Sequence, residues 1–202
     1  MPTVNEKLAD AATSHAVDLT SYSNGVVRRI IGLLNRVDTR LFAELGQALE
    51  TMSPESFTVE RLESLLLSVR QLNLQAYQQI ERELTQELRE LVQYEAGYQL
   101  QLFQSVIPAQ VIATVGVSAV NAEQVYAAAL SRPFQGALLR EFSQRQEATK
   151  MARIRDTIRM GYVENRTTQE IVRQLRGTRA KGYSDGIIEL DRRQTEAVVR
   201  TG

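Results

Sequence analysis

One apolar stripe runs along the segment 58–106, with successive members four, three and four residues apart. The thirteen positions are Leu62, Leu66, Val69, Asn73, Tyr77, Ile80, Leu84, Leu88, Leu91, Glu95, Tyr98, Leu102 and Val106. Only Asn73 and Glu95 interrupt it, and the first glycine of the segment is Gly97. The spacing repeats every eleven residues, which is the period of a nearly straight helix of about 3.67 residues per turn. The pattern therefore predicts one helix, about 75 Å long at 1.5 Å per residue.

A face of that length needs a long partner, because an exposed apolar stripe does not stabilise a helix in water. The preceding segment 26–52 carries a stripe in nearly the same phase: Val26, Ile30, Leu34, Val37, Leu41, Leu45, Ala48 and Met52. The residues 53–57 between the two segments include Pro54, and Thr58 is a suitable N-cap for the second helix. A connection this short favours a long antiparallel helical hairpin. The alternative is that the two helices fold back into a compact bundle.

The residues 5–24 have the pattern of a shorter helix, followed by the turn-like sequence Ser21-Tyr22-Ser23-Asn24-Gly25. Two possibilities stay open: a separate helix that ends here, or a helix that continues into the hairpin with a kink at Gly25. His15 is the only histidine of the chain. Since no carboxylates or cysteines cluster around it in the sequence, we interpret it as structural rather than as a metal ligand.

Pro108 should end the long helix, and 109–120 is an apolar connector that could be a strand, an extended segment or a buried crossover. Helices are then predicted from Asn121 to about 131, from 137 to 163, from the capping box Thr167-Thr168-Gln169-Glu170 to 176, and from 187 to 200. The segment 177–186 contains three glycines and should be a loop. The sequence thus predicts an all-α protein: a helical region 1–107 with the hairpin, a connector 108–120, and a smaller helical domain 121–202.

The predicted seam of the hairpin and the outward face of the 137–163 helix are the two sets of residues singled out here. The seam consists of Leu62, Leu66, Val69, Tyr77, Ile80, Leu84, Leu88 and Leu91, facing Val37, Leu41 and Leu45. The outward, polar face of the later helix carries Arg140, Arg145, Lys150, Arg153, Arg155 and Arg159. The first set should hold the hairpin together, whereas the second should face solvent or a partner.

The formal net charge is zero but is unevenly distributed along the chain. Residues 1–100 carry nine Lys or Arg against fourteen Asp or Glu, and residues 101–202 carry fifteen against ten. The candidates for contact with phosphate or with an acidic partner are Arg145, Arg153, Arg155, Arg159, Arg179, Lys181, Arg192 and Arg193. Interleaved acidic residues also allow an ordinary solvated surface, and both interpretations stay open.

The chain contains few of the residues and motifs on which enzyme active sites commonly rely. It has one histidine and no cysteine, no clustered metal ligands and no phosphate-binding loop. The sequence therefore predicts a protein that is not an enzyme and uses no cofactor. No signal peptide is recognisable, and the weakly polar run 111–120 is about half the length that spans a bilayer. We expect a soluble protein, made in a cytoplasm, with no membrane contact.

An ordered series of short sequence features marks the C-terminal part. Ser131-Arg132-Pro133-Phe134-Gln135-Gly136 precedes a helix that ends in Arg155-Asp156-Thr157-Ile158-Arg159-Met160-Gly161-Tyr162. The Thr167–Glu170 box, the loop from Gly177-Thr178-Arg179 to Tyr183-Ser184-Asp185-Gly186, and Arg192-Arg193 to Ala197-Val198-Val199-Arg200-Thr201 follow. Over roughly 120–201 this resembles bacteriophage head-morphogenesis proteins of the Mu F-like minor capsid family. The chain departs from them at its end, where family members continue past Arg200-Thr201.

The resemblance implies a minor component of a tailed-phage head, carried inside the capsid near the portal and present in the host cytoplasm during assembly. The implied partners are the portal protein, the major capsid protein, or both. The implied roles are head assembly, DNA packaging and DNA delivery. The hairpin could also self-associate, since its outer face is rich in Gln and Glu. The alternative is a protein that contacts packaged double-stranded DNA, or is ejected with it, through its basic C-terminal half.

Overall fold

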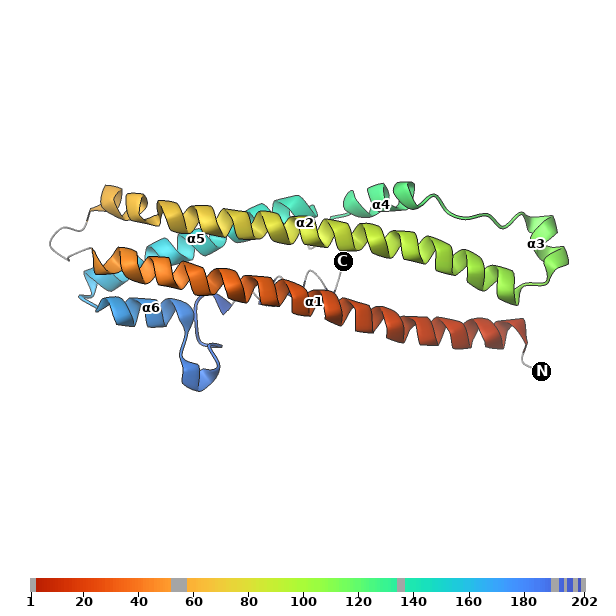
Figure 1. Cartoon of the computed structure of the whole chain (residues 1–202), viewed down its shortest axis with the longest axis horizontal. Helices are drawn as coiled ribbons and strands as arrows, with labels where there is room; N and C mark the ends of the chain where they lie inside the picture. Colours follow the sequence, from red (N-terminus) through yellow and green to blue (C-terminus); the bar gives the residue numbers. More distant parts are fainter. Residues whose placement is uncertain are drawn as a thin grey trace.

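The computed structural model is all-α and is dominated by two long antiparallel helices (Figure 1). It describes residues 3–51, 58–133 and 137–189, together with Arg193, Gln194, Glu196, Ala197 and Arg200. Helix α1 is Val4–Glu50, of 47 residues, and α2 is Val59–Val106, of 48 residues. Their contacts run in opposite directions along the chain, since Tyr98 of α2 bonds to residue 11, Glu95 to residue 15 and Glu87 to residue 22. The predicted long helical hairpin is therefore confirmed.

The ends of both helices follow from local side-chain chemistry. At the start of α1, Thr3 and Glu6 form a reciprocal capping box, in which each side chain bonds to the other residue's backbone N–H. At the start of α2, the predicted N-cap Thr58 accepts a hydrogen bond from the backbone N–H of Arg61 at 3.1 Å. Helix α2 ends at Val106, two residues before Pro108, as the sequence indicates. The predicted connection 53–57 lies outside the described residues.

Helix α1 passes without interruption through Gly25, so the predicted end of a first helix at 21–25 is wrong. The tertiary contacts of this region explain the difference. Val26 and Ile30 are buried in the seam, and the Tyr22 hydroxyl donates to a carboxylate oxygen of Glu87 at 2.5 Å. Packing against α2 therefore outweighs the weak helix propensity of the Ser-Tyr-Ser-Asn-Gly sequence. The alternative, a helix continuing into the hairpin, is the one that the structure shows.

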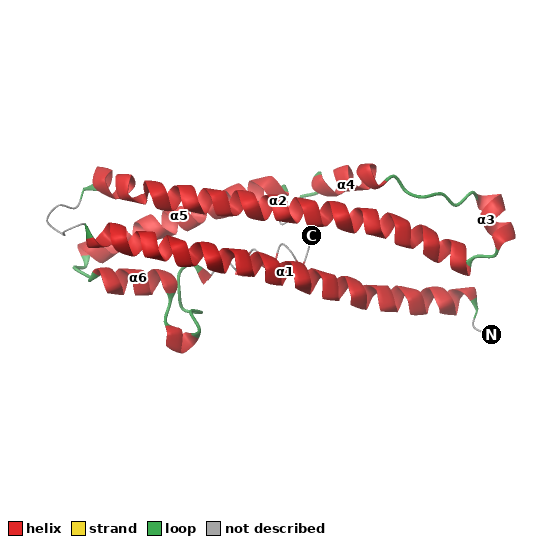
Figure 2. Cartoon of the chain, in the orientation of Figure 1, coloured by secondary structure: helices red, strands yellow, loops and turns green. Residues whose placement is uncertain are grey.

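The shorter helices α4 (Ala122–Leu130), α5 (Leu139–Val163) and α6 (Thr168–Arg176) lie along this hairpin, and α3 (Ala109–Val115) lies at its far end (Figure 2). The apolar connector begins as the short helix α3, which stops at Gly116 with a φ of 70°, and continues as a loop. The 3-10 turn η2 (Arg179–Lys181) follows α6. The predicted caps Asn121 and Thr167 are both formed. Of the predicted final helix 187–200, residues 187 and 188 form a turn, whereas Glu189, Arg193, Gln194, Glu196, Ala197 and Arg200 are helical; the other six lie outside the described residues.

Helices α5 and α6 pack on the half of the hairpin nearest the 52–57 connection. They share one apolar core with both long helices. Its buried members are Leu41, Leu45 and Leu49 of α1, Leu62, Leu66 and Val69 of α2, Met151, Ile154 and Ile158 of α5, Ile171 and Leu175 of α6, and Ile188. The C-terminal helices therefore bury their apolar faces against the hairpin, and residues on both sides of the connector build the same core.

A second apolar cluster lies further along the hairpin. It joins Val26, Ile30, Leu33 and Leu34 of α1 to Tyr77 and Ile80 of α2. The first turn of α5 reaches this region, because Leu139 and Phe142 pack against Leu84. We call the remaining end of the hairpin, residues 4–25 and 84–106, the distal segment.

The α5–α6 contact depends on the absence of a side chain at Gly161. A Cβ atom built there would lie 2.4 Å from Cγ1 of Ile171, a β-branched side chain that is only 1% exposed. We therefore expect Gly161→Ala to force the two helices apart and lower the free energy of unfolding by about 1–3 kcal/mol, despite alanine's better helix propensity. Chemical denaturation followed by circular dichroism would measure this.

Gly97 provides a matched control for that substitution. It is also within a helix, it is exposed, and a Cβ atom there would meet nothing within 4 Å among the described residues. We expect Gly97→Ala to stabilise the protein, by up to about 1 kcal/mol. Equal effects of the two substitutions would contradict the close packing of α5 on α6.

The capping box of α6 gives the stability a defined pH dependence. The backbone N–H of Thr167 donates to a Glu170 carboxylate oxygen at 2.8 Å, and this bond holds the pKa of Glu170 below its ordinary value of 4.5. A lowered pKa in the folded state means that the ionised carboxylate stabilises the fold. This contribution is complete above pH 4.5 and is lost as the pH falls through the lowered pKa.

We expect Glu170→Gln to be less stable than the unmodified protein at pH 7, with the difference shrinking towards pH 3. Denaturation midpoints at the two pH values would show it. Glu83→Gln, at an exposed position of α2, is the control. If both variants respond to pH in the same way, the capping box is not the cause.

Candidate functional site

A buried ion pair joins α5 to α1. The Lys150 ammonium lies 2.7 Å from Oδ1 of Asp38, and the two side chains are 1% and 3% exposed. The prediction that Lys150 belongs to the outward face of its helix is wrong. Sequence position alone places a lysine with neighbouring arginines on the solvated face, but its partner lies 112 residues away on α1. Burial of both charges is consistent with the rule that buried charges are paired.

More polar side chains surround this pair and form a layer across the helices. Asn73 of α2 is fully buried and donates to the backbone oxygen of Glu147 at 3.2 Å. The ring centre of Tyr77 lies 5.9 Å from the Lys150 nitrogen, within the range of a cation–π interaction. We define the polar layer as Asp38, Asn73, Tyr77, Gln146 and Lys150, which are all buried.

The polar layer separates the two apolar clusters. Along α1, Asp38 lies between Leu34 of the second cluster and Leu41 of the first. Along α2, Asn73 lies between Val69 and Tyr77. A shift of α5 by one helical turn would place Lys150 against apolar side chains, which is costly for a charge. The layer thus fixes the position of α5 on the hairpin, as single polar residues do in coiled-coil cores.

The residues predicted for the seam are brought together, but they are not equally covered. The buried ones are Leu41, Leu45, Leu62, Leu66, Val69, Tyr77 and Ile80. Val37, Leu84, Leu88 and Leu91 are only half-buried. Leu88 and Leu91 lie on the distal segment, beyond the contact of α5 with Leu84. Sequence reasoning missed Leu33, Leu49 and Val92, which are also buried. A wider apolar stripe, of about three to four positions per two turns, would have included them.

His15 links the two helices of the distal segment. Its Nε2 lies 2.6 Å from a Glu95 carboxylate oxygen, and its ring stacks on Tyr98 with centroids 3.9 Å apart. Glu95 is one of the two residues that interrupt the apolar stripe, and the buried histidine opposite explains its presence. Within the described part of the chain, no group of three or more His, Cys, Asp or Glu side chains could hold a metal ion.

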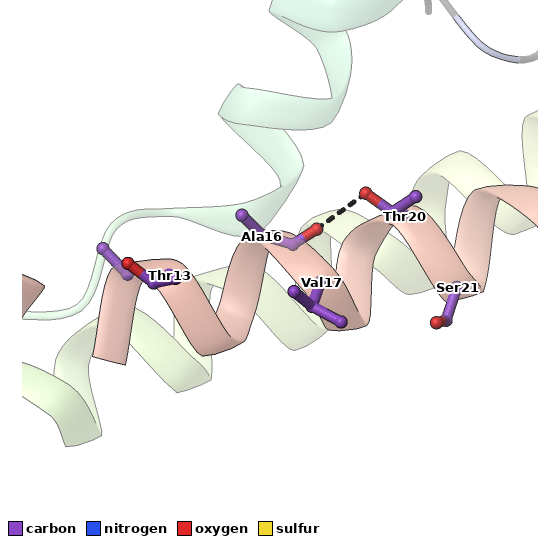
Figure 3. Close-up of a pocket in the computed structure, with 6 residues that line it drawn as sticks. Thr13, Ala16, Val17, Thr20 and Ser21 are labelled. Atoms are coloured by element: carbon purple, nitrogen blue, oxygen red, sulfur yellow. Dashed lines mark hydrogen bonds between the residues drawn. The ribbon is translucent and has the colours of Figure 1, made fainter. Parts of the chain in front are cut away.

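Eight of the thirteen exposed large apolar side chains of the described residues lie on the distal segment, on α3 and α4 and on the loop between them. They include Val17 (62% exposed), Phe103, Val111, Val115 (70% exposed), Val120 and Val125. The other five are Leu67, Leu74, Leu138, Met160 and Val163, of which Val163 is 74% exposed. Figure 3 shows a shallow hollow along α1 with Thr13, Ala16, Val17, Thr20 and Ser21 at its surface. The hydroxyls of Thr13 and Thr20 donate to backbone oxygens of their own helix, at 2.8 Å each. Because these hydroxyls are bound to the backbone, the surface here is formed largely by methyl groups.

The predicted cationic contacts do not form one patch. Arg145 and Arg159 of α5, Arg179 of η2 and Arg193 are exposed. Arg155 lies between the carboxylates of Glu63 and Asp156, at 3.9 and 3.4 Å. Lys181 is 4.0 Å from Asp185, and Arg153 is half-buried. Arg192 lies outside the described residues.

The glycine-rich loop after α6 is closed by backbone contacts. Asp185 accepts hydrogen bonds from the backbone N–H and hydroxyl of Thr178, at 2.7 and 2.9 Å. A Cβ atom at Gly186 would lie 2.4 Å from the carbonyl oxygen of Arg176. The Arg176 guanidinium in turn lies over the Tyr183 ring, 4.7 Å from its centre. The conspicuous residues of this loop thus have a structural role, because their contacts fold the loop back onto the end of α6.

Among the described residues no helix is long and apolar enough to cross a membrane. Comparison of the chain with protein-family models, with curated proteins and with solved structures found no match. The class that the fold defines is an elongated helical hairpin with shorter helices packed on one half of it.

Proposed function

We propose that this protein is a structural minor component of a tailed-phage head, located inside the capsid near the portal. In this role it acts in head assembly, DNA packaging or DNA delivery. The proposal draws on the resemblance of residues 120–201 to Mu F-like minor capsid proteins and on the shape of the molecule. It assigns a structural rather than a catalytic role.

The observation that carries the proposal is the unequal coverage of the hairpin. Near the 52–57 connection, α5 and α6 bury the seam, and the buried Asp38–Lys150 ion pair joins α5 to α1. Around the distal segment, large apolar side chains such as Val17 and Val115 remain exposed. Exposed apolar surface of this kind is typical of proteins that bind a larger assembly. The portal protein, the major capsid protein, or a second copy of this chain would cover it.

The experiment that tests the proposal is quantitative mass spectrometry of purified particles of the phage that encodes the chain, before and after DNA release. A low, fixed copy number that remains in emptied heads would support a portal-bound structural role. Loss of the protein together with the DNA would favour an ejected internal protein. Absence from particles would overturn the assignment to the head.

A second candidate function, contact with packaged DNA, is favoured by one observation. Arg145, Arg159, Arg179 and Arg193 are exposed, and within the described residues none of them forms an ion pair. Such arginines are available to phosphate groups. Two of them are on α5, four turns of helix apart, so they could follow the backbone of a duplex.

Fluorescence anisotropy with a labelled duplex would test this function. We expect affinity to fall steeply with salt, and the double variant Arg145→Gln/Arg159→Gln to reduce the log–log salt slope by about 2. Arg28→Gln, an exposed position on α1, is the control and should leave the slope unchanged. Binding that is undetectable at low salt would exclude the DNA-contacting role.

A further inference from the structure

A cleft of about 340 Å³ opens between α1 and α2 in the distal segment. From α1 it is lined by His15, Leu19 and Tyr22, and from α2 by Leu91 and Tyr94. Three of these five side chains are aromatic rings and two are leucines. Tyr94 is 55% exposed, whereas Leu19 and Leu91 are half-buried. The walls of the cleft are therefore apolar and aromatic. The Tyr94 ring is stacked near His15 and Tyr98, with centroids 6.1 and 6.0 Å apart, and more than half of its surface stays exposed.

The charged groups at this cleft are all of one sign. Asp18 and Glu90, both exposed, complete its lining, and no Lys or Arg is among the described residues that line it. Arg29 is bound to Glu87, which also accepts a hydrogen bond from the Tyr22 hydroxyl. Burial and the Glu87 carboxylate raise the pKa of Tyr22, so its hydroxyl stays protonated and committed to that bond. The cleft thus offers carboxylates and aromatic rings to a cation, and none of its described lining residues is Lys or Arg.

His15 contributes a ring nitrogen that has no hydrogen-bond partner among the described residues. Because an ionised carboxylate can only accept, Nε2 of His15 donates in the 2.6 Å contact with Glu95. The other ring nitrogen, Nδ1, is buried and is the one without a partner. In the neutral tautomer that carries its proton on Nε2, Nδ1 has a lone pair. A buried acceptor without a partner is costly, and a guest that brings an N–H donor would satisfy it.

From these features we infer that the cleft binds the guanidinium group of an arginine side chain presented by a partner protein. A guanidinium is planar, stacks on aromatic rings, has five N–H donors and no acceptor, and is less strongly hydrated than an ammonium. Its three-carbon stem can pack on Leu19 and Leu91, and its plane can stack on the Tyr94 ring. Its N–H groups can donate to Asp18, Glu90 and Nδ1 of His15. The inference rests on the proposed docking of the hairpin, and it names the chemistry by which one contact is made.

A direct test uses His15 as a reporter. It is the only histidine, so its imidazole signals in a proton–carbon NMR spectrum of the full chain belong to one residue. We expect titration with N-acetyl-arginine methylamide to shift these signals saturably, with half-saturation on the order of 10 mM for so small a ligand. The citrulline analogue, which has the same shape without the charge, should produce no saturable shift. The lysine analogue should bind at least several-fold more weakly.

Two matched variants test whether the arginine probe binds in the cleft. Asp18→Asn combined with Glu90→Gln removes both carboxylates at exposed positions, and it should weaken arginine binding at least fivefold. Asp10→Asn, an exposed acidic position of α1 that does not line the cleft, should leave binding unchanged. Unchanged spectra with the arginine probe, equal shifts with citrulline or lysine, or equal binding by both variants would each overturn the inference. None of these results depends on whether the protein is found in virions, so the two proposals can fail separately.

Discussion

Replacing Asp38 by leucine should lower the free energy of unfolding by about 3–5 kcal/mol, the largest effect that we expect for a single substitution. The reason is the position of Lys150. Its ammonium group is 1% exposed and bound to Asp38 at 2.7 Å, so the variant leaves a buried positive charge without that carboxylate. Urea denaturation followed by circular dichroism would measure the change.

The double variant Asp38→Leu/Lys150→Met distinguishes the cost of one unpaired buried charge from the contribution of the ion pair itself. It replaces both charged groups by apolar side chains, and such replacements are often neutral or stabilising. We therefore expect it to recover most or all of the lost stability. Asp156→Leu is a suitable control, because its contact with Arg155 joins two well-exposed side chains and should contribute no more than about 1 kcal/mol. If Asp38→Leu costs no more than this control, the buried pair does not position α5.

Truncation of Ile154 to alanine should cost about 2–5 kcal/mol. Ile154 is completely buried in the first apolar cluster, where α5 meets both long helices and α6. Four helices surround the site, so it cannot collapse easily around the missing carbons, and a cavity would remain. The measurement is the same denaturation experiment, with the slope of the transition compared as well as its midpoint.

Met160 on the same helix is the control for that truncation. It is 55% exposed, and Met160→Ala should change the stability by no more than about 0.5 kcal/mol. A similar loss in both variants would mean that α5 is not anchored by its inner face. The comparison also tests the shared core, because a C-terminal domain that folded apart from the hairpin would not place Ile154 against Leu45 and Leu66.

Long-period patterns and end signals were the features that the sequence could predict. The apolar stripe of 58–106 corresponds to α2 almost residue for residue. A helical period that is kept over so long a segment leaves few alternative structures. Thr58, Asn121 and Thr167 were identified as caps, and each accepts the expected backbone hydrogen bond. These signals are local in the sequence, so they can be recognised without knowing which distant residues pack against them.

Features that depend on distant partners could not be predicted. Lys150 was placed on the solvated face because nothing near it in the sequence indicates that Asp38 faces it. For the same reason, the sequence leaves open whether a helix ends at 21–25, since the burial of Val26 and the bond from Tyr22 to Glu87, which keep the helix continuous, are tertiary contacts. The cleft between α1 and α2 belongs to this class as well. His15 and Glu95 were each noticed separately, but only the register of the hairpin brings them together.

The two long helices also have a mechanical consequence. Each spans about 70 Å at 1.5 Å per residue, whereas α5 and α6 grip only the half near the 52–57 connection. The uncovered part of the hairpin is thus an arm that begins where Leu139 and Phe142 of α5 pack on Leu84. A partner that pulls on its tip would load this contact first, some tens of ångströms from where the partner binds.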